Sequence, residues 1–366
     1  MSEKVLPEGL SRRLSALVPG ATVRAVKVLG VDEHAEGESA KELGYGRPIR
    51  VTLATADGAE RSIVFHTAVP NDFGHDRRSD RAQGCLLAYD TFAEIPSHVR
   101  AVDVGAIRDD GALVSLERTH EFYLITDWTD GTLYADDLRR VGREGDVTPL
   151  DLARVDAIAR YLAHLHSLPG THPAAYTRAI RDTLGHGEGI FGLIDSYAPD
   201  VPGAPPETLR AIESKCLDWR WRLKHRTERL RRTHGDFHPF NLVWAKDAEL
   251  VLLDASRGCE GDPADDVACI AINYLFFALE HRERFSSGLG QLWERFWERY
   301  LSLAGPSVLE SLAPFFAWRA LVIASPLWYP HLTRDDRARI FAFVLRALDN
   351  DRFDPAWGAE AMKHSS

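Results

Sequence analysis

The sequence predicts an α+β fold with a small β-rich N-terminal lobe and a larger, mainly helical C-terminal lobe. Alternating apolar and polar residues, typical of strands, are concentrated before residue 128. From about residue 134 onward, apolar residues recur every three or four positions, as in amphipathic helices. The length of 366 residues is sufficient for two lobes that each bury a core. We therefore expect an N-terminal lobe at residues 1–128 and a C-terminal lobe at residues 129–366.

The N-terminal lobe is expected to be a small sheet with one main helix, after a short amphipathic helix at residues 8–18. Residues 48–55 and 61–68 alternate apolar and polar side chains, and Asp57-Gly58 between them is a strong hairpin signal. The elements that follow are a helix at 79–93 and strands near 99–105, 112–117 and 122–127.

Helical segments make up most of the C-terminal lobe. Residues 152–168 have a helical apolar period that stops at Pro169-Gly170. The stretch 171–206 is rich in Gly and Pro, which predicts a loop. Further helices are expected at 207–231, 265–280, 287–303, 306–324 and 334–349, and the tail 352–366 is expected to be frayed.

Composition excludes several classes of protein. No apolar run approaches the ~20 residues of a membrane helix, and the N-terminus lacks the apolar core of a secretory signal, so we expect a cytoplasmic protein without a membrane partner. The net charge of −10 argues against a nucleic-acid partner. The four Cys residues have no C-x-x-C spacing, which argues against a zinc ribbon or a disulfide framework.

A dense polar motif, THGDFHPFNLVW, occupies residues 233–244. The segments NLVWA and ELVLLDA predict a strand hairpin, with one polar loop before it and another after it. This hairpin would bring Asp236, Asn241 and Asp254 to one end. Asp and Asn oxygens suit Mg²⁺, and a carboxylate that binds no metal can accept a hydroxyl proton.

The spacing of these residues matches a phosphoryl-transfer pattern. Asn241 follows Asp236 by five positions, as in the catalytic loop of protein kinases, and Asp254 ends the next apolar strand. Gly235 stands where protein kinases have Arg. Asp and Asn are also common in turns, and His-x-Asp-x-His spacing occurs in metallohydrolases, but neither alternative explains all three positions.

The stretch HGDFHPFNLVW followed by LLDASRGCEGDPADDVA resembles the aminoglycoside phosphotransferase and choline kinase-like superfamily. YLAHLHSLPG resembles the helix before its catalytic loop, and LITDWTDG resembles its hinge. The resemblance covers roughly residues 120–275. It implies a bilobal protein-kinase-like fold that transfers the γ-phosphoryl group of ATP or GTP to a hydroxyl of a small molecule.

This resemblance implies a role for each matching residue. Asp236 would orient and deprotonate the acceptor hydroxyl, and Asn241 and Asp254 would hold Mg²⁺ on the nucleotide phosphates. The backbone around Asp127 and Trp128 would pair with the nucleotide base. The supporting residues would be His234, His238 and Asp262, which brace the catalytic loop, and Asp266, which anchors the next helix.

The N-terminal lobe departs from the superfamily pattern. Gly44 and Gly46 could cradle phosphates or simply form a turn. The third strand usually carries a Lys or Arg for the phosphates, whereas our alignment places His66 there. At the position of its usual Glu partner on the helix the register offers Gln83, with Asp80 as an alternative, and a His–Gln pair would be a neutral hydrogen bond in place of an ion pair.

Three functions therefore remain open. The first is a working small-molecule kinase, which the intact base and metal positions favour. The second is a non-phosphorylating kinase-like protein that binds a nucleotide or another ligand, which His66 favours. The third is a kinase of a peptide Ser or Thr in natural-product maturation. The sequence identifies neither the acceptor nor the oligomeric state.

Overall fold

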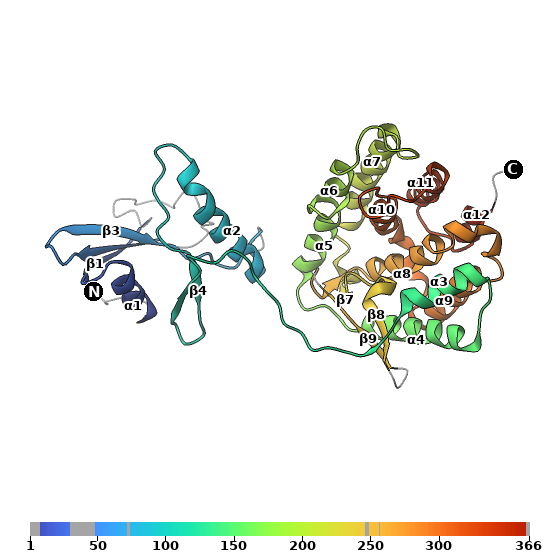
Figure 1. Cartoon of the computed structure of the whole chain (residues 1–366), viewed down its shortest axis with the longest axis horizontal. Helices are drawn as coiled ribbons and strands as arrows, with labels where there is room; N and C mark the ends of the chain where they lie inside the picture. The colour runs from blue at the N-terminus through green and yellow to red at the C-terminus, as the bar shows by residue number, and fades with distance from the viewer. Residues whose placement is uncertain (1–7, 30–47, 72–73, 246–248, 256, 364–366) are drawn as a thin grey trace. The chain divides into compact units, whose positions relative to one another are not determined.

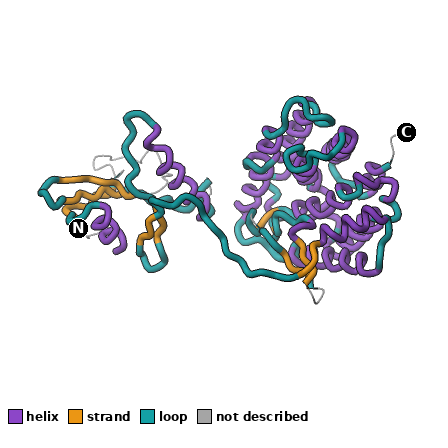
Figure 2. Tube along the Cα trace, in the orientation of Figure 1, coloured by secondary structure: helices purple, strands orange, loops and turns teal. Residues whose placement is uncertain are grey.

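The structure is a computed structural model that describes residues 8–29, 48–71, 74–245, 249–255 and 257–363. The chain divides into two compact units, Met1–Thr126 and Asp127–Ser366 (Figure 1). The first contains most of the β-structure and the second is mainly helical, which confirms the predicted α+β class (Figure 2). No helix among the described residues combines the length and apolarity needed to cross a membrane.

The N-terminal unit contains a three-stranded antiparallel sheet in the order β1-β2-β3. Its strands are β1 (Thr22–Val28), β2 (Ile49–Ala54) and β3 (Glu60–Phe65). The expected hairpin forms between β2 and β3, with Ile49 opposite Phe65, and Gly58 in the turn has a φ of +85°. Glycine adopts this left-handed conformation without steric cost. The strand β3 ends three residues earlier than expected, at Phe65 rather than at residue 68.

The helix α1 (Glu8–Leu17) covers this sheet. Leu10 and Leu14 form a small buried core with Val51 and Leu53. In the same unit, Arg13 donates to both carboxylate oxygens of Asp103, at 2.7 and 2.9 Å. A separate hairpin follows, made of β4 (Gly105–Ile107) and β5 (Leu113–Ser115), and it also contacts α1.

Two expected strands of the N-terminal unit differ from the structure. The strand expected at residues 99–105 is replaced by the shorter strand Gly105–Ile107, and residues 99–104 form no strand. Residues 122–127 also form no strand, and Tyr123 and Leu124 are exposed. An alternating apolar pattern needs a neighbouring strand to pair with, and no described strand pairs with this segment. The helix α2 (Arg78–Thr91) forms close to its expected position.

The C-terminal unit packs its helices around one hydrophobic core. These helices are α3 (Tyr134–Glu144), α4 (Pro149–Leu165), α5 (Pro173–Gly185), α6 (Ile190–Asp195), α7 (Pro206–Leu223), α8 (Ala264–Phe276), α9 (Leu289–Ala304), α10 (Leu312–Ile323), α11 (Arg334–Leu348) and α12 (Ala356–Met362). Aromatic side chains fill much of the core, among them Tyr134, Tyr176, Tyr274, Phe296, Phe316 and Phe341. The amphipathic patterns of the sequence thus reflect burial against a common centre.

Two segments expected to be irregular form helices. Residues 171–206 contain α5 and α6, because Pro173 occupies the first turn of α5, where its missing N–H costs nothing. Tyr176, Ile180 and Leu184 then lie on one buried face at a spacing of four. The tail contains α12, whose Met362 is buried in the main core. Burial therefore orders both segments despite their composition.

The polar motif lies between two short antiparallel pairings. The sheet β6-β8-β9 consists of β6 (Gly131–Leu133), β8 (Leu242–Ala245) and β9 (Leu250–Leu252), with Leu242 opposite Leu252. The second pairing joins β7 (Arg231–Arg232) to β10 (Glu260–Gly261). The Thr233 amide also donates to the Cys259 carbonyl at 3.1 Å. The loops before and after the hairpin therefore lie side by side.

Candidate active site

The loop of residues 233–241 is attached to the first turn of α8 through Asp266. The two carboxylate oxygens of Asp266 accept hydrogen bonds from the backbone amides of His234 and Gly235, both at 2.8 Å. His166, at the end of α4, lies 3.2 Å from the same carboxylate. Burial alone would raise the pKa of Asp266, but these hydrogen bonds hold it below its usual range. Asp266 therefore fixes the loop as a buried carboxylate.

Asp262 holds a different part of the scaffold. Arg229 donates to both of its oxygens, at 2.7 and 3.1 Å, and the Tyr176 hydroxyl donates at 2.9 Å. The hydroxyl of Ser311, the residue that precedes α10, also donates to the Asp262 carboxylate. These contacts join three helical segments to the start of α8. The sequence led us to expect that Asp262 braces the catalytic loop and that Asp266 anchors the next helix. In the structure it is Asp266 that accepts hydrogen bonds from the loop.

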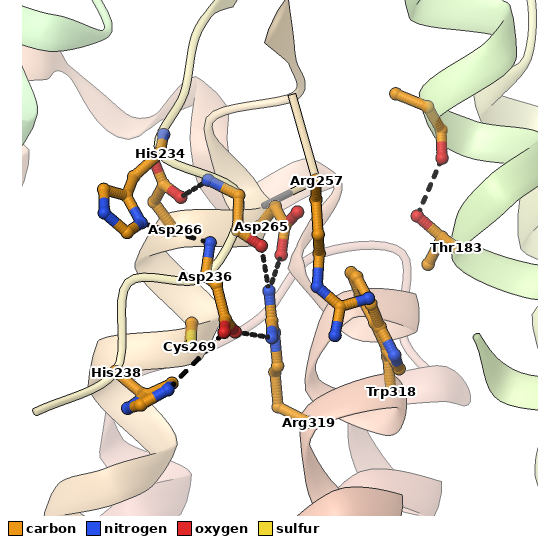
Figure 3. A network of polar contacts seen from close by, with 12 residues as sticks. Thr183, His234, Asp236, His238, Arg257, Asp265, Asp266, Cys269, Trp318 and Arg319 are labelled. Carbon is orange, nitrogen blue, oxygen red and sulfur yellow. Dashed lines mark hydrogen bonds and ion pairs between the residues drawn. The ribbon is translucent and has the colours of Figure 1, made fainter. Parts of the chain in front are cut away.

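Asp236 is mostly buried and carries an ion pair. Its Oδ1 accepts a hydrogen bond from Nη1 of Arg319 at 2.7 Å, and Nε2 of His238 lies 3.5 Å from its Oδ2 (Figure 3). Burial by itself would raise the pKa of Asp236. The hydrogen bond with His238 and the positive charge of Arg319 instead hold that pKa well below its usual range. Asp236 is therefore an ionised, acceptor-only side chain at neutral pH.

The two His side chains of the motif make local hydrogen bonds. Nδ1 of His234 accepts from the Asp236 amide at 3.3 Å, and Nδ1 of His238 accepts from the Phe240 amide at 3.2 Å. A ring nitrogen that accepts carries no proton, so Nε2 of each neutral ring is the donor. The His234 ring also packs edge-on against Phe237, with centroids 5.7 Å apart. The two hydrogen bonds from backbone amides to the His rings stabilise the loop of residues 233–241.

Asp254 follows a residue whose backbone is paired with Asn241. The amide of Leu253 donates to the carbonyl of Asn241 at 2.9 Å, so Asp254 follows directly after a residue paired with Asn241. Nδ2 of Asn241 donates to the carbonyl of Asp236 at 3.1 Å, which leaves its side-chain oxygen available as a ligand. Asp254 is exposed and has a φ of +49°, a conformation that non-glycine residues adopt rarely.

This donor set fits a hard cation such as Mg²⁺. The described residues contain no group of three or more His, Cys, Asp or Glu side chains arranged to hold a metal ion. The Asn241 oxygen and the Asp254 carboxylate would therefore be two ligands, and nucleotide phosphates and waters would supply the others. Mg²⁺ commonly binds proteins in this way, through one or two carboxylates together with phosphates.

The candidate nucleotide residues of the N-terminal unit are less defined. His66 follows β3 directly and is exposed, and Gln83 is exposed on α2. No hydrogen bond joins these two described side chains, so the expected His–Gln pair is not formed. Gly44 and Gly46 lie outside the described residues.

Asp127 and Trp128 begin the C-terminal unit in an extended, exposed stretch. The indole nitrogen of Trp128 donates to Asp130 at 2.9 Å. In the described secondary structure, neither residue takes part in a strand, so their backbone groups are not committed to a sheet. Their pairing with a nucleotide base remains a prediction.

Sequence reasoning missed Arg319 and its second carboxylate partner, Asp265. The Arg319 guanidinium lies between Asp236 and Asp265 (Figure 3), and its Nη2 donates to Asp265 at 2.6 Å. It also stacks on the neighbouring Trp318 ring, 4.1 Å from the centroid. A usable signal was present, since Arg319 is the one charged residue in the apolar helix LAPFFAWRALVI. A buried charge in such a helix usually has a partner.

The pKa of Asp265 shifts in the opposite direction from that of Asp236. Burial raises the pKa of Asp265 to about 6, although the ion pair with Arg319 opposes this shift. The negative charge of the neighbouring Asp266 adds to the rise. Two carboxylates on one guanidinium thus differ in basicity, because Asp265 lies next to another carboxylate whereas Asp236 also faces His238.

The glycine-rich stretch GHGEG lies beside this cluster. The Glu188 carbonyl accepts from the indole nitrogen of Trp318 at 2.7 Å, and its carboxylate lies 3.6 Å from Arg257. The Arg257 guanidinium stacks over the Trp318 ring at 4.4 Å. Gly192 is required here, since a Cβ would lie 1.9 Å from the Gly187 carbonyl oxygen. The stretch therefore contacts Trp318 and Arg257 next to this cluster, while the Glu188 residue as a whole stays exposed.

Comparisons with known proteins identify the family of this chain. A family model described as the phosphotransferase enzyme family matches residues 88–304, more than half of the chain. A search of curated proteins gave no match. Similar solved structures include choline kinase LicA from Streptococcus pneumoniae, with 15% identity over 93% of this chain and 97% of that chain and a TM-score of 0.34. Aminoglycoside phosphotransferase APH(3'')-Id from Streptomyces rimosus has 16% identity over 82% and 89%, with a TM-score of 0.34. Amicoumacin kinase hAmiN, in complex with AMP-PNP, Ca²⁺ and Ami, has 14% identity over 96% of both chains and a TM-score of 0.39.

Proposed function

Because this chain belongs to the phosphotransferase enzyme family, we propose that it moves the γ-phosphoryl group of ATP or GTP to a hydroxyl of a small molecule. One observation carries the proposal. The hydrogen bond from Leu253 to Asn241 sets Asp254 beside Asn241, whose side chain is bonded to the backbone of Asp236. The candidate base and the two candidate metal ligands would thus lie on one loop and the hairpin that follows it, as phosphoryl transfer requires.

Asp236 would act on the acceptor. Its ionised carboxylate would accept a hydrogen bond from the acceptor hydroxyl and orient it. The acceptor oxygen forms a bond to the γ-phosphorus, the bond to the β–γ bridging oxygen breaks, and the nucleoside diphosphate leaves. The hydroxyl proton passes to Asp236. Because Asp236 is a weak base, it takes this proton only as the new bond makes the hydroxyl acidic.

Asn241 and Asp254 would hold Mg²⁺, which neutralises charge on the phosphates when bound. The Asn241 amide is already oriented by its hydrogen bond to the Asp236 carbonyl. Substrate binding therefore need not order this side chain, which reduces the entropic cost of assembling the site. The backbone at Asp127 and Trp128, with Gly44, Gly46 and His66, would contact the nucleotide.

A second function is favoured by one observation. His66, where a Lys or Arg is expected, is exposed and follows β3 instead of lying within it. An imidazole is shorter than a Lys side chain and is not a permanent charge, so it binds phosphate less strongly. The protein would then be a kinase-like module that binds a nucleotide or another ligand without transferring phosphate.

Thermal unfolding with ATP or GTP, with and without Mg²⁺, tests the proposal. A ligand at about 100 times its dissociation constant stabilises the native state by about 2.7 kcal/mol. We expect a magnesium-dependent shift in the parent that Asp254→Asn removes. Asp351→Asn is the matched control, since Asp351 is an exposed carboxylate whose partner is Arg222. A parent that neither nucleotide stabilises at millimolar concentration would refute the nucleotide site and favour the binding module.

A further inference from the structure

Arg319 reaches the catalytic loop from α10, which is distant in the sequence. Its guanidinium makes three hydrogen bonds: to Oδ1 of Asp236 at 2.7 Å, to the carbonyl of Gly235 at 2.7 Å and to Oδ1 of Asp265 at 2.6 Å. The side chain is 6% exposed. Burying an Arg in an apolar helix is costly unless it is paired, so the two carboxylates explain how Arg319 is tolerated.

These contacts fix the position of the Asp236 carboxylate. A guanidinium is planar, with its donors in a rigid fork, and Arg319 is also held by its stacking on Trp318 at 4.1 Å. One nitrogen of the fork binds the Asp236 side chain and another binds the backbone of the preceding residue. The side chain and the peptide that carries it therefore have a common anchor.

The backbone at this point has a conformation that favours glycine. Gly235 has a φ of +82°, in the left-handed region, and a Cβ there would lie 3.2 Å from Cβ of Arg257. Protein kinases have an Arg at the position before the catalytic Asp, whereas this chain has Gly. Arg319 supplies a guanidinium to the same loop from a helix instead.

The two oxygens of Asp236 have different partners. Oδ1 is bound by Nη1 of Arg319 at 2.7 Å, whereas Nε2 of His238 lies 3.5 Å from Oδ2. We propose that Arg319 is a positioning residue for phosphoryl transfer, which holds Oδ1 of Asp236 so that Oδ2 accepts the proton of the acceptor hydroxyl. This inference rests on the proposed function and adds to it a residue that acts through Asp236.

Several charged and titratable groups face Asp236 and would influence a pH readout. They are His238 on the same loop, Arg257 after β9, Asp265 and Cys269 on α8, and Arg319 on α10. Of these, Arg319 is the one whose side chain lies within 3 Å of the Asp236 carboxylate. Removing the positive charge of Arg319 should therefore raise the pKa of Asp236, while the contribution of His238 is kept.

The test compares Arg319→Gln and Arg319→Lys with the parent. The probe reaction is hydrolysis of Mg-ATP, with water as the acceptor. We expect Arg319→Gln to lower kcat at least 30-fold while KM for ATP changes less than twofold, because Arg319 contacts the base and not the nucleotide. Arg319→Lys keeps the positive charge but lacks the forked donors of a guanidinium, so its kcat should lie between those of Arg319→Gln and the parent. If Arg319→Gln does not fold, the same comparison is made with Arg319→Lys alone.

A second readout separates positioning from general stability. The Asp236 carboxyl is followed by ¹³C NMR as a function of pH and assigned with Asp236→Asn. In Arg319→Gln we expect its titration midpoint to rise by more than one pH unit. The matched control is Arg337→Lys, since Arg337 is equally buried but binds only the carbonyls of Ala324, Tyr329 and Leu332. This control should leave both kcat and the midpoint unchanged.

The outcomes distinguish the inference from the proposed function. A folded Arg319→Gln variant that keeps the parent's kcat would overturn the role of Arg319. An equal loss of kcat in Arg337→Lys would also overturn it, because the effect would then be one of general destabilisation. A parent that neither binds nor hydrolyses Mg-ATP would instead refute the proposed function.

Discussion

The carboxylate of Asp266 accepts a hydrogen bond from the backbone amide of Gly235 at 2.8 Å, across 31 positions of sequence. Its other oxygen accepts from the His234 amide at the same distance. One buried side chain at the start of α8 thus satisfies two consecutive amides of the loop that carries Asp236. The loop geometry therefore depends on a helix as well as on the hairpin next to it.

Asp266→Asn should destabilise the protein. An amide offers one accepting oxygen in place of two, so one of the two loop amides loses its partner inside the protein. The loss of a charge-assisted hydrogen bond in a buried site costs about 2–3 kcal/mol. Chemical denaturation of the parent and the variant measures this difference. Asp218→Asn, an exposed carboxylate on α7, is the control and should change the free energy of unfolding by less than about 0.5 kcal/mol. Equal stability of the parent and Asp266→Asn would contradict the anchoring role.

Asp236→Asn should abolish phosphoryl transfer and spare nucleotide binding. Asn cannot accept the hydroxyl proton, and loss of a general base typically lowers the rate by about 10²–10⁴-fold. Arg319 keeps its ion pair with Asp265, so the variant should fold. Hydrolysis of Mg-ATP measures the rate, and the thermal shift with Mg-ATP measures binding. Full activity in Asp236→Asn would show that another group is the base.

Asp265 should make stability depend on pH between about 4 and 6. Its pKa in the folded protein is about 6, above the value of about 3.9 for an unfolded chain, so the folded state binds more protons in this range. The unfolding free energy of the parent, relative to Asp265→Asn, should therefore rise as the pH falls from 6 to 4. Denaturation curves at several pH values give this difference. A difference that stays constant, or that falls over the range, would show that the pKa of Asp265 is not raised.

The parts of the site that sequence reasoning found are local. Asp236 and Asn241 share one short loop, and the antiparallel pairing of β8 with β9 brings Asp254 to them. Residue spacing encodes such an arrangement directly. Arg319, by contrast, lies 83 positions from Asp236, and its contact depends on how α10 packs against α8. No periodicity in the sequence specifies that packing.

The errors in the predicted fold also arise from tertiary packing that the sequence does not specify. Gly and Pro in residues 171–206 were interpreted as breakers, but Gly189 and Gly192 allow close backbone contacts around α6, and Pro173 starts α5. The opposite error occurred at residues 122–127, where a strand pattern found no partner strand. In each case the outcome depended on tertiary neighbours, which a single sequence does not reveal.

The position of Arg319 also has a consequence for protein engineering. The family match ends at residue 304, whereas α10 begins at Leu312. Under the proposed function, the side chain that holds the base would come from outside the matched segment, so that segment would not be sufficient for catalysis. A chimera that transplants only residues 88–304 into a relative would inherit Asp236 without its guanidinium anchor. Functional transplantation would require α10 as well.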